Sequence, residues 1–559
     1  CRGLLGSQGP AGLHCSGGGV MIKRYKSWWL LALFFAASVI MTYPAFSGHF
    51  MKLTMDGGIH LSRMESIFEM IKMGKLPPLV NFIGLGNHGN AFNGMYPWVS
   101  MAIFFVLPRF FLTSPMHALF ASYVLINIAT LLNAYLLTRE LSKDTRIRLF
   151  ATLFYGFNAY HLTLLFSRNA VGEALAYTFA PLVLLGCFQI WRGRTKGILH
   201  IALGMGMIAN SHVISLFLMV LFLVVLEFSR LILKKITWQE IINFVIAGGL
   251  AVLIGFYSIT NIIKISGLNH LYMPEKKLEP IIVSEMVTSV LNNTIQDKSG
   301  EFNIGLIGLG ILLFLVVQLF RSQKMQRWSI WSLVTVFLFV LTTTWIPLQK
   351  PWIVNSIFGN IQFLGRMLSL IVLSLVVAIT LYLNQNRMRN DLMLIFVSVL
   401  LLLMGIGSVS QFHWKKNDDP VRYYVNNQNL VLTSHTEGHG YRDYALANPK
   451  GKILYLYANT PIKNYKGTGN TATFTVDVNY ERATIPINLY KNVEYQIYVD
   501  GKKIKQFKCA KILSLSLSRR NHKIKLIAKA GLSEYITMLI SVVSMVICSG
   551  LLLRRRYIH

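Results

Sequence analysis

Residues 54–78 read "TMDGGIHLSRMESIFEMIKMGKLPP" and follow the first long apolar run of the chain. The stretch begins with one acid, Asp56, and two glycines, continues as an amphipathic segment, and ends at Pro77 and Pro78. We expect a short helix that lies flat on the membrane surface, with Gly74 as its C-cap. The apolar side chains on one face of this helix are Ile59, Met64, Ile67, Phe68 and Ile71.

The composition of the whole chain predicts a membrane around this stretch. The 559 residues are 53% hydrophobic and 14% charged, whereas a soluble protein has about 25% charged residues. The mean hydropathy is +0.49. A formal net charge of +31 favours nucleic acid in a soluble protein, but here Lys and Arg fall mainly in short loops between apolar runs. We therefore predict an α-helical polytopic membrane protein that does not bind nucleic acid.

Apolar runs of about 20 residues, the length that crosses a bilayer, predict twelve transmembrane helices. The run 97–113 is short and holds Pro108 and Arg109, so we interpret it as a re-entrant or interfacial helix. With this count the basic loops and both termini face the cytoplasm, in agreement with the positive-inside rule. The pair at 196–234 can also be one span and a helix broken around "NSH". The predicted spans are 27–47, 116–138, 149–167, 173–191, 196–211, 212–234, 240–264, 303–320, 328–346, 365–384, 391–409 and 533–553.

The chain divides into four predicted parts. Residues 1–20 do not begin with Met and are interpreted as a leader or tag remnant. Residues 21–409 form the transmembrane domain, with a long outer loop at 48–96 and another at 265–302. Residues 410–531 carry strand-like runs and the hairpin signal "VDGKK", which predict a small extracytoplasmic β-sandwich. Residues 532–559 form the last span and a basic cytoplasmic tail.

Some chemistries find no support in the sequence. The cysteines show neither a disulfide framework nor metal-ligand spacing. No nucleotide-binding Gly-rich loop and no long cytoplasmic domain are visible, which argues against direct use of ATP or a nucleotide sugar in the cytoplasm.

The order of these features resembles the GT-C glycosyltransferases, and the first outer loop is similar to that of their bacterial YfhO-like branch. "SRNAVGEALAYTFAPLVLLG" (167–186) and "IQFLGRML" (361–368) resemble two further stretches of this branch. Leu364 and Gly365 depart from the branch, which tends to have Pro and an aromatic residue there. The loop positions that match are Asp56, His60, Arg63, Gly74, Pro77, Pro78, Gly84, Gly86, Tyr96 and Pro97.

The resemblance implies a transferase in the bacterial plasma membrane that takes a sugar from a polyprenyl-phosphate donor and passes it to an extracytoplasmic glycopolymer or lipid acceptor. A single displacement would invert the anomeric carbon. Asp56 is the predicted general base, because a carboxylate can accept the proton of the attacking hydroxyl. Arg168 and Arg366 are the predicted donor-phosphate ligands, because guanidinium groups suit phosphate. The residues predicted to contact substrate are His60, Arg63, His88, Tyr96, Glu173 and Gln362.

Each of these residues also has a structural interpretation. Asp56 can be only the N-cap of the helix that follows it, and Glu173 can simply pair with Arg168. His60 and His88 are interpreted as loop or substrate contacts rather than metal ligands. No cofactor is predicted, and a divalent metal stays open because GT-C enzymes differ in that respect; Glu173 would be its second ligand beside Asp56. The acids of the 265–302 loop, Asp297 among them, are expected to be solvated.

Two other functions remain open at this stage. The first is a lipid-linked sugar flippase or polysaccharide exporter, although no internal repeat typical of transporters is visible. The second is a scaffold without catalytic activity, whose outer β domain binds cell-wall polymer. Neither function requires an acid in the loop beside an interfacial helix.

Overall fold

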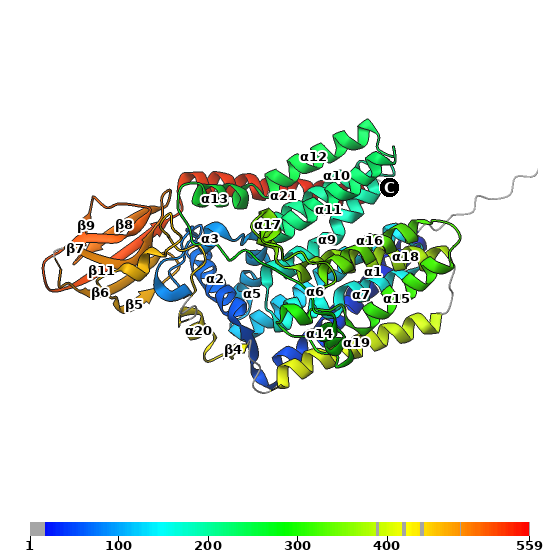
Figure 1. The fold of residues 1–559 in the computed structure, drawn as a ribbon, viewed down its shortest axis with the longest axis horizontal. Coiled ribbons are helices and arrows are strands. Elements are labelled where there is room, and N and C mark those ends of the chain that lie inside the picture. Colours follow the sequence, from blue (N-terminus) through cyan, green and yellow to red (C-terminus); the bar gives the residue numbers. More distant parts are fainter. Residues whose placement is uncertain (1–16, 387–390, 416–420, 437–440, 481, 558–559) are drawn as a thin grey trace, which may run out of the picture.

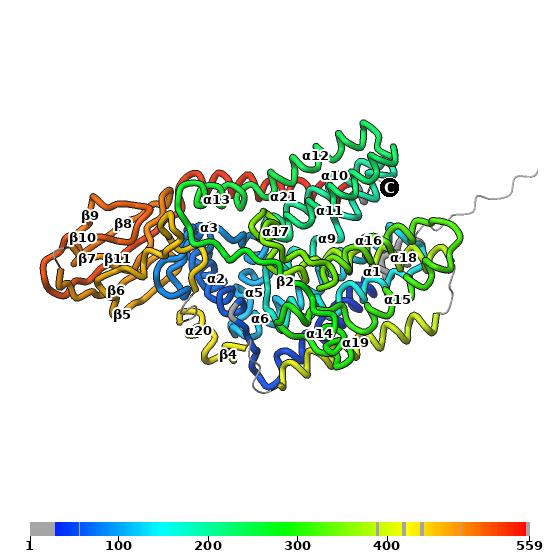
Figure 2. The backbone as a smooth tube through the Cα atoms, in the orientation of Figure 1, coloured from blue at the N-terminus to red at the C-terminus, as the bar shows by residue number. Residues whose placement is uncertain are grey.

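The computed structural model describes residues 17–386, 391–415, 421–436, 441–480 and 482–557. Its helices form an elongated bundle, and a small β domain lies at one end of the long axis (Figure 1). Figure 2 shows the last helix, α21 (Leu532–Tyr557), running from the β domain back along α13 (Phe256–Ser266). Most of the predicted leader, residues 1–16, and the end of the predicted tail, residues 558–559, lie outside the described part of the chain.

Eight helices of the described chain are long and apolar enough to cross a membrane, and each coincides with a predicted span. α9 is buried along its whole length, whereas α11, α19 and α21 expose apolar side chains on the outside of the bundle. Lipid is the solvent that suits such a surface, so the chain is a membrane protein. The eight are α1 (Gly17–Thr42), α6 (Pro115–Leu141), α7 (Thr145–Phe157) with its extension to Ser167, α9 (Val171–Ile190), α11 (Val213–Ile232), α18 (Leu368–Gln385), α19 (Asp391–Trp414) and α21.

The predicted count of twelve spans is not confirmed. The predicted span 240–264 is a pair of helices, α12 (Trp238–Ile254) and α13, bent by 68° at Gly255. Three others are short helices, and the shortest, α10 (Lys196–Ala209), has 14 residues. At about 1.5 Å per residue it covers only about two thirds of a hydrocarbon core of about 30 Å. The other two are α15 (Gly305–Arg321) and α16 (Arg327–Thr342).

Two uncertain stretches are clarified by the helix bounds. The predicted re-entrant run forms a helix over Val99–Phe111, made of α4 (Val99–Met101), the π-helical turn Ala102–Val106 and α5 (Pro108–Phe111). The region 196–234 breaks at Asn210, Ser211 and His212, so α10 and α11 are separate helices.

The helix expected from the opening stretch is α2 (Met55–Lys72). Gly74 adopts φ +66° just beyond its end. Most of the helix is buried, including polar residues such as His60 and Arg63. Other parts of the protein cover it, α20 (Leu430–Thr436) among them.

The expected β domain is present as two facing sheets over residues 463–529. One sheet has the order β5–β6–β11–β8–β9, and β10 pairs with β7 in the other. The "VDGKK" hairpin joins β8 and β9, with Asp500 and Gly501 at positive φ. The expected strand "KILYLYA" is instead a 3₁₀ turn at Leu454–Tyr457, which stacks Tyr455 on His88 at 4.0 Å. The strands are β5 (Lys463–Gly467), β6 (Thr471–Asp477), β7 (Arg482–Leu489), β8 (Glu494–Val499), β9 (Lys502–Ile504), β10 (Lys511–Ser516) and β11 (Asn521–Lys529).

Short strand pairs tie the loops to distant parts of the chain. β1 (Met51–Thr54) pairs antiparallel with β4 (Val421–Val425), and β2 (Leu278–Glu279) pairs parallel with β3 (Gln362–Phe363). Apolar residues of the first loop, such as Phe82, share the core of the β domain. Together these contacts hold the first loop, the 265–302 loop and the β domain against the same end of the bundle (Figure 1).

Candidate active site

A cavity of about 400 Å³ lies where the first loop, the 265–302 loop, the end of the bundle and the segment before the β domain meet. Arg168 follows a spanning helix directly, Glu173 lies in the first turn of α9, and Arg366 lies just before α18. The ionisable and tyrosine side chains that line the cavity are Asp56, His60, Tyr96, Arg168, Glu173, His212, Glu275, Lys277, Asp297, Arg366, Tyr441, Asp443 and Tyr444.

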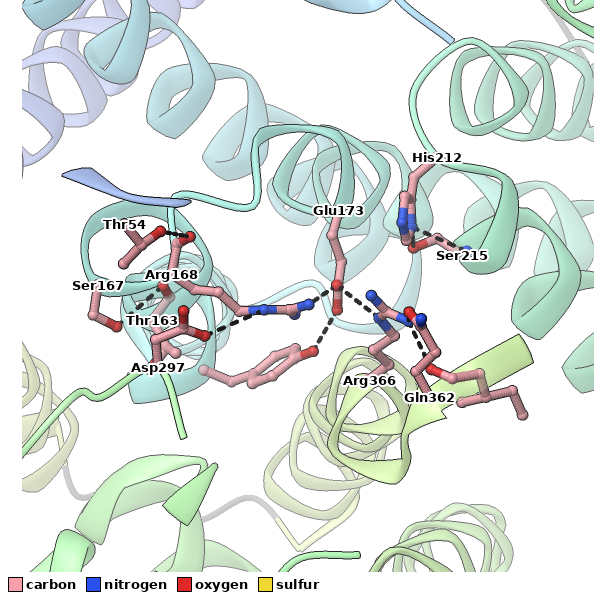
Figure 3. A network of polar contacts seen from close by, with 12 residues as sticks. Thr54, Thr163, Ser167, Arg168, Glu173, His212, Ser215, Asp297, Gln362 and Arg366 are labelled. Atoms are coloured by element: carbon pink, nitrogen blue, oxygen red, sulfur yellow. Dashed lines mark hydrogen bonds and ion pairs between the residues drawn. The ribbon is translucent and has the colours of Figure 1, made fainter. Parts of the chain in front are cut away.

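The Glu173 carboxylate holds both predicted phosphate ligands (Figure 3). Its Oε2 lies 2.8 Å from Nη1 of Arg168 and 3.3 Å from Nε of Arg366. Its Oε1 accepts a hydrogen bond of 2.5 Å from the Tyr160 hydroxyl. One carboxylate therefore orients two cations, and it neutralises only one of their two charges. This geometry gives Glu173 the pairing role that was its structural interpretation.

The ring of Phe363 lies against three cations of the site. Its centroid is 5.3 Å from the guanidinium carbon of Arg168, 5.1 Å from that of Arg366 and 4.6 Å from Nζ of Lys277. The negative face of an aromatic ring attracts cations, and it does so without satisfying their hydrogen bonds. Phe363 therefore gathers positive charge at the cavity and leaves N–H groups for a ligand.

Hydrogen bonds to the chain around Arg168 hold the start of α2, which carries Asp56. The Thr54 hydroxyl donates to the carbonyl oxygen of Arg168 at 2.7 Å, and the Thr54 amide donates to Oδ1 of Asn169 at 2.9 Å. A Cβ atom on Gly57 would lie 2.8 Å from the same Oδ1. Gly57 is thus needed for the close packing of α2 against Asn169, a role different from the approach to a ligand that two glycines suggest.

The Asp56 carboxyl group is unpaired in the cavity wall. The N-cap of α2 is Thr54, and Asp56 is half-buried in the first helical turn. Among the described residues, no side chain or amide forms a hydrogen bond or ion pair with this carboxylate. Helical capping therefore does not account for Asp56.

Two neutral histidines and a buried arginine complete this side of the cavity. Nδ1 of His60 accepts a hydrogen bond from Nη1 of Arg63 at 3.1 Å, and burial followed by this guanidinium holds the pKa of His60 well below its ordinary value. His212 caps α11, and burial followed by Arg366 lowers the pKa of His212 to about 3. Arg63 does not line the cavity: its Nη2 donates to the carbonyl oxygens of Tyr96 and Pro97 at 2.9 and 3.2 Å.

The other predicted contacts divide between the cavity and the β domain. Gln362 and Tyr96 line the cavity, and Oε1 of Gln362 accepts from Arg366 at 3.0 Å. Gln362 lies in β3 with φ +63°, outside the helix α18 that follows Arg366. His88 is not in the cavity lining; it stacks on Tyr455 and contacts the Pro486 carbonyl at 2.8 Å.

Several cavity residues were missed from the sequence. Asp297, which was expected to be solvated, has Oδ1 3.5 Å from Nε of Arg168 (Figure 3). Burial raises the pKa of Asp297 to about 7, and the Asp56 and Glu173 carboxylates add to the rise against the opposing effect of Arg168. Lys277, Tyr441 and Tyr444 had no signal beyond their places in long polar segments. The length of the 265–302 loop was the one hint that Asp297 is functional.

The acids of the cavity do not gather as ligands for one ion. Among the described residues, no three His, Cys, Asp or Glu side chains are arranged to hold a metal. Glu173 in particular already binds two arginines and Tyr160. No chemical step is therefore assigned to a metal here.

Comparisons with known proteins do not identify the residues or the chemistry of this site. No protein-family model and no curated protein matches the chain. Among solved structures, the chain is similar to the apo crystal structure of the Archaeoglobus fulgidus oligosaccharyltransferase, with 12% identity and a TM-score of 0.36. The match covers 77% of this chain and 57% of that one. Similarity at this level assigns neither a fold family nor a reaction to this chain.

Proposed function

We propose that this chain is a membrane glycosyltransferase of the GT-C type, which moves a sugar from a polyprenyl-phosphate donor to an acceptor outside the cytoplasm. The observation that carries this proposal is the unpaired Asp56 carboxylate in the same cavity as Arg168 and Arg366. The motifs of the first loop and of residues 167–186 and 361–368 support the same superfamily and, within it, the YfhO-like branch.

In the proposed reaction an acceptor hydroxyl attacks the anomeric carbon of the donor sugar. The bond from that carbon to the phosphate oxygen breaks, and its electron pair leaves with the lipid phosphate. Asp56 takes the proton of the attacking hydroxyl. Arg168, Arg366 and Lys277 stabilise the charge that develops on the leaving phosphate. A single displacement inverts the anomeric centre, and no second acid is needed because a phosphate is a good leaving group.

The half-neutralised arginine pair suits a phosphate diester, which carries one negative charge. Glu173 cancels one charge of the pair and fixes both guanidinium groups. Among the described residues, Nη2 of Arg366 has no hydrogen-bond partner, so it is available to a phosphate oxygen. A preorganised donor of this kind is worth more in a buried site than in water.

The alternative is a lipid-linked sugar flippase or polysaccharide exporter. Transporters bind their substrate near the middle of the membrane, between repeated halves of the fold. Here Arg168, Glu173 and Arg366, which line the cavity, lie at the ends of spanning helices. A flippase does not require an unpaired carboxylate beside phosphate ligands, whereas the proposed transfer reaction needs one as its general base. The position and the chemistry of the cavity therefore favour a transferase.

The test is release of polyprenyl phosphate from polyprenyl-phosphate sugars by the purified full chain, in the presence of a cell-envelope acceptor fraction. We expect release by the wild-type chain and its loss in Asp56→Asn. The control is Asp477→Asn, which alters an exposed acid of the β domain. Movement of the donor across vesicle membranes without its cleavage would instead support the flippase.

A further inference from the structure

A second group of cavity residues comes from the segment that leads into the β domain. Tyr441, Asp443 and Tyr444 all line the cavity that holds Asp56 and the arginines. The two tyrosine rings pack on Phe92, at centroid distances of 5.4 and 5.2 Å, and the ring of Tyr96 stacks on Phe92 at 5.5 Å. We call Phe92, Tyr96, Tyr441 and Tyr444 the aromatic wall. Phe92 is buried, and the three tyrosines stay half-exposed.

The backbone of this segment is held in a strained conformation. Tyr444 has φ +63°, a region that a bulky side chain rarely adopts. Its amide donates to the Tyr272 carbonyl at 2.7 Å, and its carbonyl accepts from the Tyr490 hydroxyl at 2.9 Å. The Asp443 carbonyl accepts from the Asn90 amide group at 2.9 Å. A strained backbone conformation is kept only where surrounding contacts hold it in place, and such positions are common at ligand-binding sites.

The Asp443 carboxyl group faces the cavity with one oxygen still available. Its Oδ2 accepts a hydrogen bond of 2.9 Å from the Tyr441 hydroxyl. Among the described residues, Oδ1 has no hydrogen-bond partner. Burial raises the pKa of Asp443, and the nearby Asp56 carboxylate adds to the rise. The segment therefore offers a hydrogen-bond acceptor beside aromatic surface.

This combination suits a sugar ring. The C–H groups of one pyranose face carry partial positive charge and pack on the negative face of an aromatic ring. The hydroxyl groups at the ring edge donate to carboxylate oxygens, and such bonds to charged groups are among the stronger ones. The carboxylates of Asp443 and Asp56 disfavour a second anionic group beside them, because Arg168 and Arg366 of the same cavity are assigned to the donor phosphate. Asp443 and the aromatic wall therefore suit an uncharged ligand rich in hydroxyl groups.

We propose that Asp443 and the tyrosines of the aromatic wall bind the acceptor, and that the acceptor unit is an uncharged pyranose. This rests on the proposed transferase function, because Asp56 must receive a proton from an acceptor hydroxyl held between it and Asp443. The segment before the β domain thus supplies the proposed acceptor side of the cavity.

The experiment measures binding of six methyl pyranosides, the α and β glycosides of glucose, galactose and N-acetylglucosamine, to the purified full chain by saturation-transfer NMR. We expect at least one to bind the wild-type chain. Asp443→Asn and Tyr444→Leu should each weaken that binding by about tenfold or more. Tyr444→Phe keeps the aromatic face and should keep most of the binding.

Matched controls and a parallel assay separate the possible failures. Asp477→Asn and Tyr480→Phe change an exposed acid and an exposed tyrosine of the β domain and should bind like the wild type. Thermal midpoints of all variants show whether they fold. If no pyranoside binds, or if Asp443→Asn and Tyr444→Leu bind as the wild type does, the inference is overturned. If the wild-type chain releases lipid phosphate but binds no pyranoside, the proposed transferase function is supported and the proposed pyranose acceptor is rejected. If the wild-type chain binds a pyranoside through Asp443 but releases no lipid phosphate, the sugar-binding site is supported and the proposed transferase function is rejected.

Discussion

The hydroxyl of Thr54 donates a hydrogen bond of 2.7 Å to the backbone carbonyl of Arg168. Thr54 directly precedes the helix that carries Asp56, and Arg168 supplies one of the cations of the cavity. This bond joins two segments that are far apart in the sequence, and the bond from the Thr54 amide to Asn169 reinforces it. Two short buried side chains, Thr54 and Asn169, thus hold the backbone that carries the proposed base against the backbone that carries the proposed phosphate ligand.

Asp56→Asn should lower turnover by about 10²- to 10⁴-fold, because it removes the proton acceptor and keeps the size of the side chain. The thermal midpoint should stay near that of the wild type, since Thr54 and not Asp56 is the N-cap. The measurement is lipid phosphate release together with a thermal melt, with Asp477→Asn as the control. Near-normal turnover in Asp56→Asn would assign the base to another residue.

Arg366→Ala should weaken donor binding by about 10- to 100-fold, the usual effect of losing hydrogen bonds to a charged group. Arg366→Lys should restore only part of the affinity, because an ammonium group cannot form the planar two-point contact. Binding of the donor lipid is measured by titration in detergent. Arg146→Ala, at an exposed arginine paired with Asp391, is the control. Equal donor affinity in Arg366→Ala and the wild type would remove Arg366 from the donor site.

Glu173→Gln should destabilise the protein, since loss of one partner of a buried ion pair typically costs about 3–5 kcal/mol. It leaves Arg168 and Arg366 buried without their shared anion. Sulfate should therefore raise the thermal midpoint of Glu173→Gln more than that of the wild type.

Glu140→Gln provides the matched comparison for this prediction. Glu140 also bridges two arginines, Arg192 and Arg194, but their side chains are 40% and 48% exposed. Its loss should cost little, and sulfate should not rescue it. Equal thermal midpoints for Glu173→Gln and the wild type would show that Glu173 does not organise the cations.

Donor affinity should fall as the pH rises through about 7. In this range Asp297 loses its proton, because burial raises its pKa to about 7, and the ionised carboxylate then competes with the donor phosphate for Arg168. A phosphate diester has no second proton to lose, so the donor itself does not titrate there. Titrations from pH 5.5 to 8.5 measure the effect.

Asp297→Asn is the decisive variant for this pH dependence. It keeps the shape of the side chain and removes the titrating group, so its donor affinity should be flat over the same range. A pH step that persists in Asp297→Asn would assign the titration to another group.

The β domain and the termini should lie on opposite sides of the membrane. Tyr480 of the β domain and Gln323, in the basic turn between α15 and α16, are both exposed. With all native cysteines replaced by serine, a membrane-impermeant maleimide should label Tyr480→Cys in intact cells and Gln323→Cys only after lysis. The reverse pattern would invert the predicted orientation.

Periodicity and charge predicted much of the helical part of this fold. α9 and α18 follow long, mainly apolar runs. The Asp500-Gly501 turn was predictable because it needs residues that accept positive φ. Arg168 and Arg366 were predicted because their stretches resemble those of a known family and because guanidinium groups suit phosphate.

The other features of the fold and of the candidate site could not be predicted, because they depend on contacts between segments that are distant in the sequence. An apolar face on α2 says nothing about its polar face, which here is covered as well, so that Arg63 is buried. Asp297 and Tyr444 lie in long polar segments with no local pattern, and only the folded chain brings them to Asp56. The alternating residues of "KILYLYA" favoured a strand, but stacking of Tyr455 on His88 overrides that local preference.

The pairing of β1 with β4 has a consequence for synthesis. Met51 leaves the ribosome early, but its partner Val425 emerges only after most of the bundle has been made. Until then the nascent chain holds Asp56 and both arginines in a cavity that still lacks Tyr441, Asp443 and Tyr444. The lining of this cavity is therefore complete only after residue 444 has been made, and a chain that stops before it lacks the residues of the proposed acceptor side. For the proposed transferase, this order of synthesis would keep an incomplete chain from reacting with its donor.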